Sequence, residues 1–411
     1  MRHIAGAAAP ITHNGGRPPM TAPAPPAVAL APFFASAFVW NLALGMSHVL
    51  IPLYAYHLGY SGVAIGTLVS APVVAQLAFN LVGGVWTDRI GGKRLALASS
   101  AMLGVAGVVY AFASTFAALL FAQLCIILSR SIYWPATWSL GSQLPGDRSA
   151  QMGRLNSITS AGQIVGTVAA GLAIVHLGYR AGFAVLAFFG GVVALALMAA
   201  FRAPDHRRPT DAQPILATYR ALARRPSIWF GLATAYLAGL PFSLSFSFYP
   251  ILLVAEGFTS DQTGWMIALR ALGSVCAGVT AARFVRKVTE RSIPVGAGLA
   301  TAVTILAIAA FTHAAPISLC LFAVGLASGV LTLYFQLLAS EISTTDTRGS
   351  TLAIAGLGWG LSHLTTPLLM GALTDAVGIH AAFYLFGALA VALALGLAPL
   401  HAWAFRGGRP R

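Results

Sequence analysis

Long apolar runs alternate with short polar breaks along most of the chain. A helix that crosses a bilayer needs roughly 20 consecutive apolar residues, and these runs are about that long. The pattern therefore predicts an all-α integral membrane protein with twelve membrane-spanning helices. The predicted helices are residues 32–56, 64–87, 95–116, 118–143, 153–177, 181–201, 228–254, 262–283, 292–313, 317–341, 350–376 and 380–404.

One polar stretch divides the helices into two groups of six. Residues 204–227 are rich in proline and arginine and form the only long internal loop. We therefore expect one six-helix bundle at 31–203 and a second at 228–405, with a cytoplasmic linker between them. Residues 1–30 are rich in alanine and proline, which is typical of a disordered tail, and residues 406–411 form a short tail at the other end.

The two groups of helices carry a weak internal repeat. An offset of 198 positions aligns Pro52 with Pro250. In the later helices an offset of 200 aligns Gly171 with Gly371. Two pseudo-symmetric bundles, with a substrate site where they meet, are the physical expectation for such a chain.

Composition and charge set the class of protein and its orientation. Apolar residues make up 58% of the chain and charged residues 8%, whereas a soluble domain carries about a quarter charged residues. The net charge of +14 would suggest nucleic acid in a soluble protein. Here 21 of the 24 basic residues lie in tails or loops that are cytoplasmic if the N-terminus is inside. The positive-inside rule therefore predicts cytoplasmic N- and C-termini in a bacterial-type inner membrane, with no nucleic-acid partner.

The loop between the second and third predicted helices, residues 83–94, reads GGVWTDRIGGKR. It closely resembles the signature loop of the major facilitator superfamily, G-x-x-x-D-R-x-G-x-K/R-K/R. The matching residues are Gly84, Asp88, Arg89, Gly91, Lys93 and Arg94. A second turn, from Glu341 to Arg348, is similar to the acidic-then-Arg-Gly turn of the same family.

This resemblance implies a twelve-helix secondary transporter that works by alternating access. It implies that the two motifs form a conformational gate, in which Asp88 latches the cytoplasmic side. Alternatively, the basic residues of this loop only determine the topology of the chain. That interpretation does not explain why Asp88 and the glycines occur at the spacing of the motif.

The resemblance also implies that the first, fourth, seventh and tenth helices line a central cavity. Polar side chains on these helices are the substrate-binding candidates, because an exposed polar side chain is costly in hydrocarbon. The candidates are Asn41, His48, Gln123, Arg130, Trp134, Tyr236, Ser243 and Gln336.

Arg130 is the most informative of these residues. A charged side chain near the middle of a membrane helix is costly, and all ten Asp and Glu residues map to loops or helix ends. We expect Arg130 to bind an anionic group of the substrate or to steer a proton; the alternative is a structural arginine bonded to backbone carbonyls. His48 and Arg130 are the candidates for proton coupling. For Arg270 the same two interpretations, functional and structural, stay open. His363 is a weaker candidate for proton coupling than His48.

The function expected is proton-coupled export of a small organic solute, such as a metabolite, a siderophore or a drug. Two alternatives stay open: import of an organic anion such as a carboxylate, and a receptor or scaffold with this fold that carries no flux. The chain has no Walker A motif, dinucleotide fingerprint or zinc spacing, so we expect neither an enzyme nor a cofactor or metal site. A monomer that interacts with its substrate, protons and lipid is expected.

Overall fold

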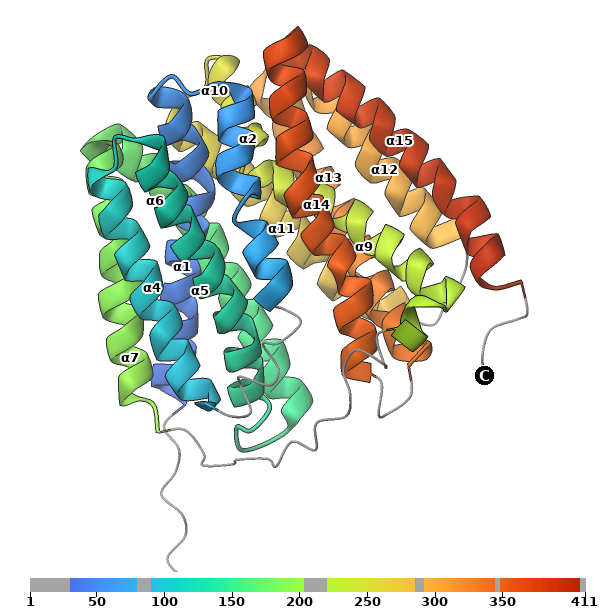
Figure 1. The fold of residues 1–411 in the computed structure, drawn as a ribbon, viewed down its shortest axis with the longest axis horizontal. Helices are drawn as coiled ribbons and strands as arrows, with labels where there is room; N and C mark the ends of the chain where they lie inside the picture. Colours follow the sequence, from blue (N-terminus) through green and yellow to red (C-terminus); the bar gives the residue numbers. More distant parts are fainter. Residues whose placement is uncertain (1–29, 80–89, 203–219, 285–291, 344–347, 407–411) are drawn as a thin grey trace, which may run out of the picture.

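The protein is all-helical in the computed structural model, which describes residues 30–79, 90–202, 220–284, 292–343 and 348–406 (Figure 1). Within these ranges, eight helical stretches are long and apolar enough to cross a membrane. Gly84, Asp88 and Arg89 of the signature loop lie outside the described residues. The helices form two groups that follow the order of the chain, one from its first half and one from its second.

The first group contains the helices before the linker. Its elements are α1 (Ala31–His57), α2 (Gly62–Ser70), α4 (Gly92–Phe112), α5 (Phe116–Gly141), α6 (Arg148–Leu186), the π-helical segment η1 (Ala187–Val193) and α7 (Ala194–Ala200). The second group contains α9 (Pro226–Ser245), α10 (Phe248–Ala255), α11 (Ser260–Phe284), α12 (Ser292–Ile308), α13 (Ala314–Glu341), α14 (Arg348–Val377) and α15 (Ile379–Ala404).

Proline interrupts two of the helices that the sequence predicts as continuous. The helix expected at 228–254 divides into α9 and α10, with Phe246 and Ser247 between them. Pro250 lacks an N–H, and its ring would meet the carbonyl group of Phe246 in a regular helix, so the chain breaks there. The helix expected at 64–87 is interrupted in the same way after Ser70, just before Pro72.

The fifth and sixth predicted helices, 153–177 and 181–201, meet without a loop. Helix α6 continues from the fifth into the first turns of the sixth, which η1 and α7 complete, but Gly178 has φ 80° and ψ 170° and is not helical. A single residue therefore reverses the chain, which glycine allows because it has no Cβ to clash at positive φ. The corresponding residue of the second bundle, Gly378, has φ 83° and separates α14 from α15.

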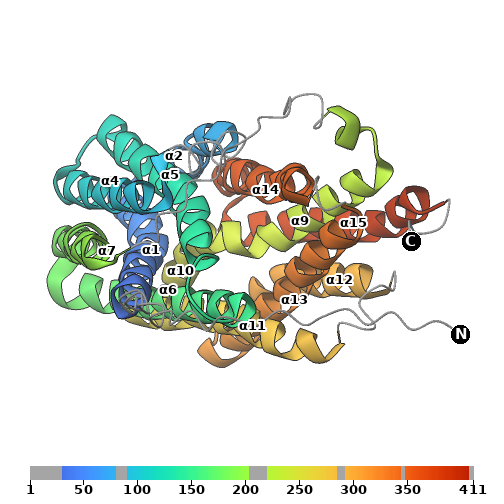
Figure 2. The ribbon, with the colours of Figure 1, turned by 90° about the horizontal axis from the view of Figure 1, so that it is seen from below.

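The two bundles meet through glycines at the ends that the sequence predicts to be external. There α2 lies beside α14, and α6 beside α11 (Figure 1 and Figure 2). A Cβ atom on Gly171 would collide with the backbone of Ser260, and one on Gly371 with the backbone of Gly62. Gly171 and Gly371 are the pair that the internal repeat aligns, so equivalent positions in both bundles allow this close approach of backbones.

A carboxylate of the second bundle caps a helix of the first. Asp375, near the end of α14, accepts hydrogen bonds from the backbone N–H groups of Gly62 (2.6 Å) and Val63 (2.8 Å) at the start of α2. A negative charge is favourable at a helix N-terminus because the peptide dipoles place partial positive charge there. Asp375 therefore stabilises the contact between the bundles at this end.

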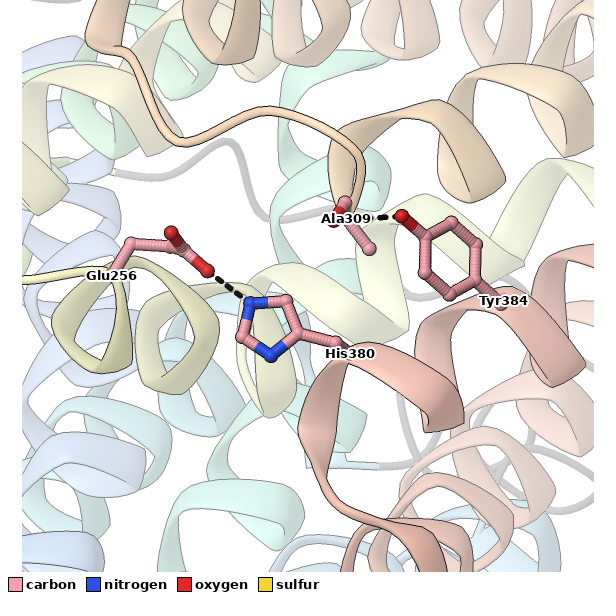
Figure 3. Close-up of polar contacts among 4 residues, drawn as sticks. All are labelled: Glu256, Ala309, His380 and Tyr384. Carbon is pink, nitrogen blue, oxygen red and sulfur yellow. Dashed lines mark hydrogen bonds and ion pairs between the residues drawn. The ribbon is translucent and has the colours of Figure 1, made fainter.

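Another acidic side chain at the same end acts inside a single bundle. Glu256, which follows α10, pairs with His380 in the first turn of α15 (Figure 3). Nearby, the hydroxyl group of Tyr384 donates a hydrogen bond of 3.1 Å to the carbonyl of Ala309. These contacts tie together α10, α12 and α15, all from the second bundle.

Replacing Asp375 with asparagine is expected to loosen the closure between the bundles. The loss of a charge at a helix N-terminus costs about 1 kcal/mol, which is about a fivefold shift in a two-state equilibrium. The reporter is Thr366→Cys, a fully buried position in α14, in a chain without Cys125, Cys276 and Cys320. An impermeant thiol reagent added from outside should label the reporter about five times faster in Asp375→Asn.

The matched control is Glu256→Gln, since it removes an external charge whose partner lies in the same bundle. That variant should leave labelling of Thr366→Cys unchanged. Equal acceleration in both variants would mean that general loosening, and not the cap on α2, explains the effect.

Candidate functional site

Two arginines, one from each bundle, lie over the same aromatic ring. The guanidinium carbon of Arg130 on α5 is 6.0 Å from the centroid of Phe242, and that of Arg270 on α11 is 5.3 Å from it. Arg130 also lies 5.7 Å from the centroid of Phe246. Cations at such distances are attracted by the negative face of an aromatic ring.

Two histidines contact the same pair of rings. The ring of His48 on α1 lies 5.5 Å from Phe242 and 5.7 Å from Phe246 between centroids. The ring of His363 on α14 lies 5.3 Å from Phe242 and 5.0 Å from Phe246, and Trp359 lies one turn before it. We call these residues the arginine–aromatic cluster; they are His48, Arg130, Phe242, Phe246, Arg270, Trp359 and His363.

The break in the seventh span positions the two phenylalanines. Phe242 lies in the last turn of α9, one turn before Phe246, which occupies the interruption between α9 and α10. Ser243, on the same turn, is within 3.2 Å of Nδ1 of His363. The Ser362 hydroxyl is also 3.2 Å from that nitrogen. These contacts fix the ring of His363 beside the cluster, whereas Nε2 of His48 has no hydrogen-bond partner among the described residues.

The cluster has an excess of positive charge. The exposed fraction is 8% for Arg130 and 6% for Arg270, and the Nε atom of each has no hydrogen-bond partner among the described residues. The described acidic residues all lie at helix ends or in loops; they are Asp147, Glu256, Asp261, Glu341 and Asp375. A buried charge is normally paired, so the arrangement is suited to receive an anion.

Asn41 lies in a network that joins three helices. Its side-chain amide donates to the hydroxyl of Tyr133 on α5 at 3.2 Å, and its carbonyl accepts from Nε2 of Gln163 on α6 at 3.0 Å. The ring of Tyr133 stacks on Trp40 with centroids 3.6 Å apart. These contacts tie α1 to α5 and α6.

The other predicted site residues do not belong to the arginine–aromatic cluster. Gln123 accepts a hydrogen bond of 2.9 Å from Tyr110 on α4. Trp134 packs with its edge toward Trp40. The hydroxyl of Tyr236 is 2.8 Å from that of Thr365. Gln336 is exposed.

The described part of the gate motifs lies at the opposite end of the helices from Asp375. Gly91 has φ 92° and precedes α4, and the ammonium group of Lys93 donates a 2.9 Å hydrogen bond to the carbonyl of Ala199. Arg94 is exposed, as is Glu341 at the end of α13. Arg348 is the first residue of α14, and its side chain is not among those that the structure describes.

Sequence reasoning did not select Phe242 and Trp359, although both belong to the cluster. An aromatic residue in an apolar helix carries no polar signal, so it is not distinguished from the residues that face lipid. The usable signal was the spacing: Phe242 is one turn before Phe246, and Trp359 is one turn before His363. As for metals, no group of three or more His, Cys, Asp or Glu side chains in the described ranges is placed to hold one.

The family follows from a comparison over almost the full length. The model of the Major Facilitator Superfamily matches residues 33–259 and 239–411. The chain belongs to the major facilitator superfamily. It is therefore a multi-pass membrane protein and a secondary transporter of a small solute, and not an enzyme.

Two curated proteins are similar to this transporter in sequence. The 3-(3-hydroxy-phenyl)propionate transporter of Escherichia coli (strain K12) is 27% identical over 336 residues, which cover 77% of this chain and 80% of that one. Multidrug resistance protein 2 of Bacillus subtilis (strain 168) is 26% identical over 160 residues. That second match spans only 38% of this chain and 39% of the relative.

Solved structures of other members share the fold. The nucleoside transporter NupG superposes with a TM-score of 0.75 at 12% identity, covering 90% of this chain and 98% of that one. A bacterial homolog of the human lysosomal transporter Spinster, in an inward-facing conformation, gives a TM-score of 0.74 at 16% identity, covering 91% and 96%. These likenesses confirm the all-helical fold that the sequence predicts.

Replacing Asn41 with alanine is expected to reduce the stability of the transporter more than its activity per folded molecule. The hydroxyl of Tyr133 and the amide of Gln163 would each lose a partner, which costs about 1–3 kcal/mol. Thermal unfolding in detergent measures the loss, with the exposed Gln336→Ala as a control that should melt like the unmodified protein. An Asn41→Ala protein with an unchanged melting temperature and no flux would instead place Asn41 in the substrate site.

Proposed function

We propose that this transporter carries a small organic anion with an aromatic or apolar part. The observation that carries the proposal is the burial of Arg130 and Arg270 over Phe242 without an acidic partner among the described residues. An anionic group arriving with the substrate would offset the cost of these charges. Phe242, Phe246 and Trp359 would supply apolar contact to the rest of the molecule.

The name of one relative agrees with this chemistry. 3-(3-Hydroxyphenyl)propionate consists of an aromatic ring and a carboxylic acid, which is ionised at neutral pH. The relative that carries this name aligns with most of the chain, whereas the multidrug resistance protein aligns with less than half of it. An aromatic carboxylate is therefore the first substrate to test.

For the direction of transport we propose export, coupled to protons. The membrane potential, negative inside, drives an anion outward by about 2.3 kcal/mol per charge per 100 mV. His48 is the residue that we propose carries the proton, because it contacts the same rings as Arg130 and its Nε2 is unpaired among the described groups. The inner membrane, with both termini cytoplasmic, is the location that the 21 basic residues in tails and loops support.

The gate remains a proposal as well. Lys93 holds the end of α7 through the carbonyl of Ala199, and the motif places Asp88 five residues before it. We propose that Gly84, Asp88 and the basic residues of this loop close the cytoplasmic side while Asp375 is released from α2. Glu341 and Arg348 would act at the equivalent turn of the second bundle.

Arg130 variants test the substrate class. With purified protein in liposomes and 3-(3-hydroxyphenyl)propionate as the probe, Arg130→Lys should reduce flux about tenfold, because an ammonium group cannot replace the two-pronged guanidinium contact. Arg130→Ala should reduce it about a hundredfold, since a hydrogen bond to a charged group is worth about 1.5–3 kcal/mol. Flux is normalised to monodisperse protein recovered in detergent.

Arg154→Ala is the control for loss of a cation over a ring. Arg154, in the second turn of α6, is exposed and lies 4.3 Å from the centroid of Phe34. Neither residue belongs to the cluster, so removal of Arg154 should leave flux near normal. Full activity in a well-folded Arg130→Ala protein would remove Arg130 from the site. No flux of any organic anion by the unmodified protein would favour a receptor or scaffold.

The response to membrane potential tests the direction and the coupling. Exchange of an outgoing monoanion for an incoming proton moves net charge, whereas import of a monoanion with one proton moves none. Efflux of preloaded probe from liposomes should therefore accelerate when a potassium gradient with valinomycin makes the interior negative. His48→Gln should keep this response but lose the effect of a pH gradient. Efflux that ignores the potential would contradict export and support electroneutral import.

A further inference from the structure

We propose that the preferred substrate of the arginine–aromatic cluster is a dianion with two separate acid groups, one for Arg130 and one for Arg270. The inference rests on the proposed transport of organic anions and makes the substrate class narrower. It predicts a small dicarboxylate whose acid groups are joined by an aromatic or apolar spacer.

The charge balance of the cluster is the first argument. Arg130 and Arg270 are each more than nine-tenths buried, and each has an Nε atom without a partner among the described residues. The described acidic side chains lie at helix ends or in loops, whereas Arg130 and Arg270 lie well inside α5 and α11. A monoanion would offset only one of the two charges, whereas a dianion would offset both, and an uncompensated buried charge is strongly disfavoured.

The placement of the arginines on different bundles is the second argument. Arg130 belongs to α5 of the first bundle and Arg270 to α11 of the second, yet both lie over Phe242. Two guanidinium groups that share one ring repel each other. An acid group on each would replace that repulsion with two attractive contacts, so the ligand would hold both bundles at once.

The ring that both cations contact is the third argument. The centroid of Phe242 lies within 6.0 Å of both guanidinium carbons, and the centroids of Phe246 and His363 lie beside it. A spacer that joins two acid groups would therefore meet aromatic faces along its length. Apolar contact of this kind favours an aryl or short alkyl spacer over a sugar, whose hydroxyl groups would need partners.

Uptake by liposomes that contain the full-length protein, at pH 7.5, tests the proposal. The labelled probes are benzoate, with one acid group, and phthalate, isophthalate and terephthalate, with two groups at increasing separation. Phenyl phosphate supplies a double charge on one group. Liposomes without protein correct for passive entry of neutral acids. At least one of the dicarboxylates should be taken up with a kcat/KM about tenfold above that of benzoate and of phenyl phosphate.

Arg270 variants assign the second acid group. Arg270→Gln should abolish the advantage of the dicarboxylate while benzoate uptake through Arg130 remains. Arg270→Lys, which keeps the charge, should retain part of the advantage, and this variant preserves the test if the glutamine variant fails to fold. Arg154→Gln is the matched control, and its preference for the dicarboxylate should equal that of the unmodified protein.

The two proposals fail in different ways. Equal uptake of benzoate and all three dicarboxylates would overturn two-point binding and leave transport of organic anions intact. A kcat/KM for phenyl phosphate equal to that of the best dicarboxylate would also overturn two-point binding. The total charge of the substrate, and not the separation of its two acid groups, would then determine the preference. If the unmodified protein transports neither benzoate nor the other anions, both the anion function and the dianion inference are wrong.

Discussion

The proposed site depends on the burial of two guanidinium groups, one from each bundle, in a membrane interior where the described residues include no acidic side chain. Arg130 and Arg270 lie over one ring and are almost fully covered. Charges in such a place are retained only if something offsets them. Within the described residues, cation–π contacts with Phe242 and Phe246 compensate part of the cost of burying these charges. The remaining attraction is available to a ligand, and the proposed transport of an anion rests on it.

The fold supplies the conditions for this arrangement. Glycines such as Gly171 and Gly371 let the bundles approach backbone to backbone at one end, and Asp375 adds a charged cap across the same contact. Both contacts link helices of different bundles, so a relative motion of the bundles must break them. Since each arginine also belongs to a different bundle, any ligand that holds both is coupled to that motion, which is the requirement for alternating access.

Much of this could be predicted from the sequence, because in lipid the cost of polar groups makes them conspicuous. The helix count and the candidacy of Arg130 and His48 rested on that cost, whereas the family rested on the signature loop at residues 83–94. Pro250 could have predicted the break between α9 and α10. The hydropathy pattern alone did not, because it does not include the backbone hydrogen bond that a proline cannot form. Phe242 could not be selected, since its role depends on two cations brought from distant segments. The cap formed by Asp375 was equally hidden, because its partners are backbone groups more than 300 residues away.

Binding of an anion to the purified protein tests the central claim most directly. The measurement is the melting temperature in detergent as a function of added 3-phenylpropionate, compared with 3-phenylpropionamide, a neutral molecule of the same shape. A ligand that binds the folded state at 100 times its Kd stabilises it by about 2.7 kcal/mol. The account predicts a concentration-dependent rise with the carboxylate, no rise with the amide, and no rise with either in Arg130→Ala. Equal stabilisation by the carboxylate and the amide would contradict recognition of charge by the buried arginines.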